Sequence, residues 1–269
     1  AMSYLKASGL VGGVVLVLGA AATGMWWAGR DGSPGSSSVT FRVQNPTSAP
    51  SGPSDPFAGS PAAAYPDGEA GIEMPPATAT SDLTRTDVEA AYARIKRILV
   101  AADLDTGTVY LGDTKPLAAA LDPGQAKGLA SRRVWMNAFA PGSAVAATPV
   151  VKVRGTVVPS PSKDGMTVKT DHNFVYAVHP PKRPDAVQRV IVRRAVTFTV
   201  TRENGEVSVW MSRVGRVAAP APCSTQDGWI HPTFPGDPGG GDSTARTEDP
   251  YDMSKPPVFD GGCRQVTGT

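Results

Sequence analysis

An uncharged apolar run near the N-terminus, from Ala7 to Gly29, constrains this chain more than any other feature. An α-helix rises about 1.5 Å per residue, so about 20 apolar residues cross the hydrocarbon core of a bilayer. Lys6 precedes the run, Arg30 follows it, and two tryptophans near its end are typical of the membrane–water interface. We therefore expect residues 1–30 to form a short tail and a transmembrane helix.

The flanking charges predict the orientation of this helix. Lys6 and the terminal amine precede it, whereas Arg30 beyond it is offset by Asp31. Positively charged flanks stay in the cytoplasm, so we expect a single-pass protein of the cell membrane with its C-terminal domain outside the cytoplasm. The alternative is a cleaved signal peptide, because the three alanines at 20–22 are small residues of the kind a signal peptidase accepts. The chain would then be secreted.

Composition divides the rest of the chain. Residues 31–80 are dominated by Pro, Ser, Gly and Ala, which bury too little apolar surface to offset the entropy of ordering the chain. We expect a disordered linker there and a folded domain at residues 81–234. Residues 235–269 are again rich in Gly and Pro and are expected to form a tail.

The two cysteines of the chain, Cys223 and Cys263, both lie in its C-terminal part. An extracytoplasmic location permits a disulfide between them. In the chain-entropy model, closing a loop of about forty residues contributes roughly 4 kcal/mol. We expect this disulfide to hold the C-terminal tail against the end of the domain.

Helical patterns open the predicted domain. From Val88 to Ala102 apolar residues recur at helical spacing, and Thr86 with Glu89 has the spacing of a capping box. A second, shorter helix is expected from Pro116 to Leu121, with Thr114 as its cap.

Valine-rich segments separated by turn residues follow these helices. Asp164-Gly165 and Asn204-Gly205 predict tight hairpin turns. The strands are expected at residues 149–158, 166–178, 187–201 and 207–217. The predicted fold class is α+β, with one to three helices packed on a curved four-stranded antiparallel sheet.

Candidate chemistry is sparse. Asp103-Leu-Asp105-Thr-Gly-Thr108 resembles the nucleophile loop of haloacid-dehalogenase-type phosphatases and the loop of aspartic proteases, but the later Lys, paired acids or second aspartate loop do not follow. Asp-Thr-Gly is also ordinary turn chemistry after a helix, and we favour that interpretation. His172, His179 and His231 match no common zinc spacing. We expect no enzymatic activity, no metal and no cofactor.

Charge gives one further candidate surface. The net charge of +2 offers no electrostatic case for nucleic acid, which calls for a clustered basic face. Arg189, Arg193, Arg194 and Arg202 lie along one predicted hairpin. They form either a solvated sheet face or an interaction face for acidic headgroups, wall polymers or a partner protein.

Two resemblances follow from these segments. A long helix, a short helical region and an antiparallel meander behind one anchor and a linker resemble NTF2-like or cystatin-like domains, in the layout of VirB8-type and TcpC-type subunits of secretion and conjugation machines. Several shorter segments are similar to uncharacterised actinobacterial membrane proteins over about residues 85–265. They are Leu111-Gly-Asp, Leu117 to Pro123, Val190-Ile-Val-Arg-Arg194, Cys223 to Phe234, and Asp249-Pro-Tyr-Asp252 with Cys263.

The similarity to the uncharacterised membrane proteins implies no known activity. We expect a non-enzymatic, extracytoplasmic protein-interaction or assembly module built on the NTF2-like domain, with other envelope proteins as its partners. One alternative is a pocket that binds a small ligand or carries out a reaction, because cone-shaped sheets can enclose a cavity. Convergent polar residues inside the cone would favour that alternative, and an apolar, filled cone would favour the scaffold.

Overall fold

The computed structural model describes residues 55–222, 227–237, 247–256, 265–266 and 269. The apolar run at 7–29 and both cysteines lie outside these residues. Among the described residues, no helix is both long enough and apolar enough to span a bilayer.

A four-stranded antiparallel sheet forms the centre of the described chain, with its strands in the order of the sequence. Asn204 and Gly205 both have positive φ, 51° and 84°, which the tight turn before the last strand requires. The α+β class, the four strands and their order of pairing are confirmed. The strands are β1 (Val145–Ser162), β2 (Gly165–His179), β3 (Gln188–Glu203) and β4 (Glu206–Ala219).

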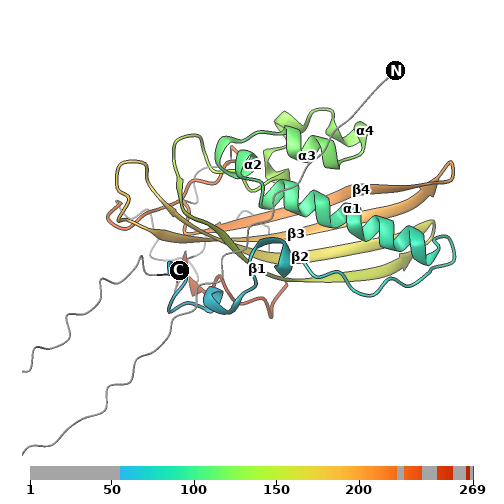
Figure 1. Cartoon of the computed structure of the whole chain (residues 1–269), viewed down its shortest axis with the longest axis horizontal. Coiled ribbons are helices and arrows are strands. Elements are labelled where there is room, and N and C mark those ends of the chain that lie inside the picture. Colours follow the sequence, from blue (N-terminus) through green and yellow to red (C-terminus); the bar gives the residue numbers. More distant parts are fainter. Residues whose placement is uncertain (1–54, 223–226, 238–246, 257–264, 267–268) are drawn as a thin grey trace, which may run out of the picture. The chain divides into compact units, whose positions relative to one another are not determined.

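Helices cover one face of this sheet, with α1 lying along it and three short helices grouped beside α1 (Figure 1). The α-helices are α1 (Arg85–Asp103), α2 (Thr106–Leu111), α3 (Lys115–Ala120) and α4 (Pro123–Ala126). The 3-10 helices are η1 (Pro61–Ala64), η2 (Gly68–Gly71), η3 (Leu129–Ser131) and η4 (Arg133–Trp135), and the two-residue strands β5 (Thr247–Glu248) and β6 (Gln265–Val266) pair in parallel.

The N-terminal cap of α1 lies two residues before the predicted one. Thr84 accepts a hydrogen bond from the backbone N–H of Asp87 at 3.2 Å, and the Asp87 carboxylate accepts one from the Thr84 N–H at 2.8 Å. This is a capping box with Asp in the place of Glu. Thr84 and Thr86 both precede an acid by three residues, so spacing alone could not choose between them.

The core between α1 and the sheet is apolar and filled. Val88, Ile95 and Leu99 of α1 are at most 1% exposed and belong to one cluster with Phe174 of β2 and Phe198 of β3. Side chains that alternate along each strand supply the sheet side of this cluster. The interior between α1 and these strands is therefore apolar and filled.

The opposite face of the sheet is also covered where β2 and β3 pair. Val175 of β2 and Ile191 of β3 are at most 1% exposed and form a second cluster with Phe57, Tyr65 and Tyr251. The rings of Tyr65 and Tyr251 meet edge to face, with centroids 6.3 Å apart. Segments before α1 and after β4 therefore meet on this face, which we call the far face.

The predicted boundaries at 80 and 235 need correction for this reason. Phe57, Tyr65 and Ile72 were assigned to the linker, yet they are 2%, 5% and 0% exposed. Tyr251, assigned to the tail, is 8% exposed. A segment poor in apolar residues can still pack when each of its few large side chains finds a site on an existing sheet, which average composition does not reveal.

Candidate functional site

Polar side chains converge inside the protein where the end of α1 meets the sheet. Asp103, the last residue of α1, and Arg194 of β3 are 0% and 1% exposed, and Arg194 Nε lies 3.2 Å from Asp103 Oδ1. The hydroxyl of Tyr176 donates to the backbone oxygen of Asp103 at 2.7 Å and accepts from Asn137 Nδ2 at 3.0 Å. Arg216 of β4 completes this buried polar cluster.

Burial dominates the electrostatics of the cluster. It raises the pKa of Asp103 to about 7, although the charges of Arg194 and Arg216 act in the opposite direction. Burial also lowers the pKa of Arg216 to about 10. Within the described residues neither carboxylate oxygen of Asp103 accepts a hydrogen bond. Arg194 instead donates to the backbone oxygens of Val134 and Trp135.

The two aspartates of the Asp-Leu-Asp-Thr-Gly-Thr motif have different structural positions. Asp103 points into the core, out of reach of a molecule in solution. Asp105 caps α2, because its Oδ1 accepts a hydrogen bond from the Thr108 N–H at 2.8 Å. The motif therefore joins two helices and does not follow a strand, as the nucleophile loop of a phosphatase would.

The structure does not place Arg189, Arg193, Arg194 and Arg202 on one exposed face. The two-residue period of β3 turns Arg194 toward α1, on the same side as the core valines of that strand. Arg189 and Arg193 lie on the far face, where they donate to backbone oxygens of the covering segments. Arg202 forms an ion pair with Asp87 near the start of α1.

Arg193 holds down the segment that follows β4, and we call residues 249–255 the C-terminal strap. Its guanidinium contacts both carboxylate oxygens of Asp171, at 3.0 and 2.7 Å. It also donates to the backbone oxygens of Asp252 at 3.2 Å and Lys255 at 2.7 Å. Arg193 thus pairs with the carboxylate of Asp171 and holds the strap against the sheet. Its charge therefore has a structural role.

The three histidines lie in separate environments. His172 is 1% exposed, neither ring nitrogen has a hydrogen-bond partner among the described residues, and burial lowers its pKa to about 4. Gly155 makes room for this ring, because a Cβ there would lie 2.2 Å from it. His231 Nε2 lies 2.9 Å from Asp227, and His179 Nδ1 lies 3.0 Å from a neighbouring carbonyl. The described part of the chain holds no group of three or more His, Cys, Asp and Glu placed to bind a metal ion.

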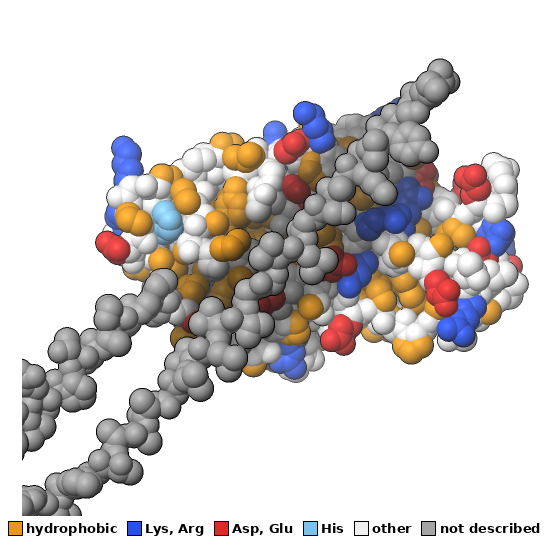
Figure 2. All heavy atoms as spheres, viewed as in Figure 1, with side chains coloured by type: hydrophobic (Ala, Val, Ile, Leu, Met, Phe, Trp, Pro, Cys, Tyr) orange, Lys and Arg blue, Asp and Glu red, His pale blue; other side chains and the backbone are white. Residues whose placement is uncertain are grey.

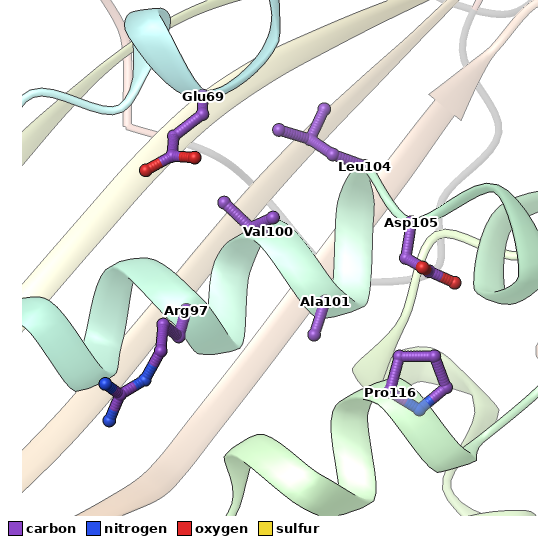
Figure 3. A pocket seen from close by; sticks show the side chains of 7 residues that line it. All are labelled: Glu69, Arg97, Val100, Ala101, Leu104, Asp105 and Pro116. Atoms are coloured by element: carbon purple, nitrogen blue, oxygen red, sulfur yellow. The ribbon is translucent and has the colours of Figure 1, made fainter. Parts of the chain in front are cut away.

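One hollow on the helical side of the protein has a volume of about 280 Å³. Figure 3 shows residues that line it, among them Glu69 of η2, Arg97 of α1, Leu104 at the end of α1 and Pro116 of α3. Glu69 lies 3.4 Å from Lys96, and Asp105 on the rim already caps α2. Glu69 and Asp105 therefore have partners of their own, whereas Arg97 is exposed and its side chain makes no ion pair or hydrogen bond within the described residues.

A second, larger hollow of about 540 Å³ lies between α2 and the start of β1, and we call it the α2–β1 groove. Its lining comes from two segments, within residues 104–111 and within residues 146–151, and none of the lining residues carries a charge. Leu111 on its edge is 78% exposed, the most exposed of the large apolar side chains described. Apolar surface of this kind is where contacts with other molecules concentrate.

The groove owes its shape to an irregularity in β1. Ala146 pairs with Val178 and Val151 pairs with Tyr176, so the four residues between them on β1 face a single residue of β2. Three residues are therefore extra on the β1 side, and Ala147, Thr148 and Pro149 of this bulge line one wall of the groove. Bulges of this kind commonly end pairing beside functional sites.

Sequence reasoning missed both walls of the groove. Asp105-Thr-Gly is predicted to be a turn after the first helix, whereas these residues cap and begin α2. The Asp105 cap and Gly112, with φ of 66° after the last turn, mark this short helix. The bulge left no comparable signal, because valine, alanine and proline around residue 149 are compatible with a continuous strand start.

Figure 2 shows Lys and Arg side chains interspersed with Asp and Glu among the described residues that are visible in this view. No protein-family model, no curated protein and no solved structure matches this chain.

Proposed function

We propose that this chain is a membrane-anchored, extracytoplasmic protein-interaction or assembly module of the cell envelope. In this proposal the apolar run at 7–29 is the anchor and the NTF2-like domain is the module, without enzymatic activity, without a cofactor and without nucleic acid as a partner. Other envelope proteins are its partners.

The observation that carries the proposal is the filled interior of the domain. The sheet face beneath α1 is occupied by apolar side chains that are nearly all below a tenth exposed, such as Phe174, Phe198 and Val200. Of the polar groups that converge there, Asp103, Asn137, Tyr176 and Arg194 are at most 1% exposed, and Arg216 is half-buried. A reaction needs groups that a substrate can reach, whereas a scaffold needs a rigid core and an accessible outer surface.

A second candidate function rests on the α2–β1 groove. Its volume of about 540 Å³ falls within the range typical of small-molecule sites, about 300–1,000 Å³. An uncharged, apolar lining would suit a neutral apolar ligand. The groove therefore supports the alternative function, in which the domain binds a small ligand.

Thiol labelling in intact cells tests the anchor, the orientation and the disulfide together. A membrane-impermeant maleimide is applied with and without prior reduction, and labelling only after reduction is expected. The variant Cys223→Ser is the matched control, because it would leave Cys263 free and therefore labelled without reduction. Labelling of the unaltered chain only after lysis, with no reductant, would overturn both the orientation and the disulfide. Release of the chain into the medium would identify it as secreted.

A further inference from the structure

We propose that the far face carries a peptide-binding site, which the C-terminal strap of the same chain occupies as an autoinhibitory contact. A partner protein that presents a tyrosine-bearing turn similar to Asp249-Pro-Tyr-Asp252 would bind there by displacing the strap. This inference rests on the proposed interaction function and names a surface that would carry it, together with its regulation. The contacts of the strap show which chemistry the site recognises.

One aromatic ring anchors the strap. Tyr251 is 8% exposed, whereas every other residue of the strap is half-buried or exposed. The Tyr251 ring packs in the cluster of Val175 and Ile191 and meets Tyr65 edge to face, an arrangement that aromatic pairs favour. A segment that replaces the strap therefore needs one aromatic side chain at this position.

Backbone oxygens make the remaining contacts of the strap with the sheet. Asn173 Nδ2 donates to the backbone oxygen of Pro250 at 3.1 Å. Arg193 donates to the backbone oxygens of Asp252 at 3.2 Å and Lys255 at 2.7 Å. Because none of these hydrogen bonds uses a strap side chain, another segment with the same turn can make all three.

The strap owes its shape to hydrogen bonds within itself. Asp249 Oδ1 accepts a hydrogen bond from the Tyr251 N–H at 2.8 Å, and the backbone oxygen of Asp249 accepts one from the Asp252 N–H at 3.1 Å. Asp252 Oδ1 accepts one from the Ser254 N–H at 2.9 Å. Aspartates that bond to the backbone two residues later are ordinary turn formers. A short peptide of this sequence therefore carries the information for the turn without the rest of the chain.

The strap leaves polar atoms of the far face unused. Asn173 Oδ1, Arg189 Nε and Tyr251 Oη are buried and have no hydrogen-bond partner within the described residues. A buried polar atom without a partner costs free energy, so a segment that satisfies one of them would bind better than the strap does. The strap competes through its covalent tether, since a tethered segment acts at an effective concentration of the order of millimolar. Displacement by a partner therefore requires a better fit and not a different kind of contact.

A fluorescein-labelled peptide with the strap sequence, residues 249–255, serves as the probe. Fluorescence anisotropy is measured against the full chain in phosphatidylcholine nanodiscs, with empty nanodiscs as the blank. The peptide should bind Tyr251→Ala at least about tenfold more tightly than the unaltered chain, because the variant's own strap has lost its anchor and no longer competes. Asp249→Ala, at an exposed position, loosens the turn and should act in the same direction. It carries the test if Tyr251→Ala loses the amide-exchange protection of α1.

A second substitution in the strap variants locates the peptide. Arg193→Met should weaken its binding at least about tenfold, because two backbone oxygens of the turn lose their donor. Arg202→Met is the matched control, since Arg202 lies on the same strand but pairs with Asp87, and it should leave binding unchanged.

Three results would overturn the inference. They are equal affinity of the peptide for the unaltered chain and the folded strap variants, no saturable binding to those variants up to about 1 mM, and equal weakening by Arg193→Met and Arg202→Met. Thiol labelling reports the location and anchoring of the chain and does not depend on the peptide. A failure here is therefore distinguishable from a failure of the proposed function.

Discussion

Replacing Arg194 with methionine tests whether the buried polar cluster is a structural ion pair. The substitution keeps an unbranched apolar side chain beneath α1 but removes the cation next to Asp103 and two donors to the backbone oxygens of Val134 and Trp135. Removing one member of a buried ion pair typically costs about 3–5 kcal/mol, because the partner is left buried without compensation.

The free energy of unfolding that is lost in Arg194→Met should depend on pH in a defined direction. Asp103 has a pKa near 7 in the folded protein against an ordinary value of 3.8, because it is buried. A carboxyl with a raised folded-state pKa stabilises the fold at low pH, and this contribution is lost as the pH rises through that pKa. Arg194 lowers this pKa, so the variant raises it further. Between pH 7 and the new pKa, the cost of the variant should grow by up to about 1.4 kcal/mol per pH unit.

The assay is urea unfolding of the unaltered and variant chains at pH 5.5 and pH 8.5, followed by circular dichroism. His172 has the opposite linkage, since its folded-state pKa of about 4 lies below 6.5 and its contribution is lost as the pH falls. Both the unaltered chain and the variant contain His172, so its contribution cancels from the difference between their free energies of unfolding. Arg202→Met, which breaks a pair at the surface whose two side chains are 37% and 13% exposed, is the control and should cost far less. A cost for Arg194→Met that is equal at both pH values would refute a charged Asp103 as its partner.

Four further predictions concern the packing around the site. Thr84→Ala should lower stability by about 1 kcal/mol through loss of the helix cap, measured as a lower unfolding midpoint. Gly155→Ala should lower the free energy of unfolding by about 1–3 kcal/mol, because its Cβ would meet the ring of His172. The double variant with His172→Ala should recover part of that stability in the same urea assay. His172→Leu should lessen the loss of stability as the pH falls from 6.5 to 4, and an unchanged pH profile would contradict the neutral buried ring. Arg193→Met should speed amide hydrogen exchange within the strap at 251–255 and leave exchange in α1 unchanged.

The sheet was the most predictable part of this fold. Alternating valines, together with Asp164-Gly165 and Asn204-Gly205 turns, placed all four strands to within a few residues, except at the start and end of β1. Period and turn chemistry act locally, so a single sequence reveals them. The same holds for α1, whose apolar positions at Ile95 and Leu99 both proved to be buried.

Features that depend on distant contacts were not predictable in the same way. The alternation along β3 places Arg194 on the side of the core valines, but no local pattern identifies its partner, because Asp103 lies on a helix about ninety residues earlier. The far face is covered by Phe57 and Tyr251, which stand in segments that look too polar to fold. The α2–β1 groove needs a short helix and a bulge to come together, and only the helix has a recognisable cap.

The covering of the far face also has a consequence for biosynthesis. A ribosome releases Val175 and Ile191 well before Tyr251, which follows Ile191 by sixty residues. At about 5–20 residues per second, the interval is several seconds. During that time the nascent sheet presents an apolar strip that its final cover has not yet reached. A chaperone that meets this chain as it emerges would therefore find its binding surface here, on the side of the sheet away from α1.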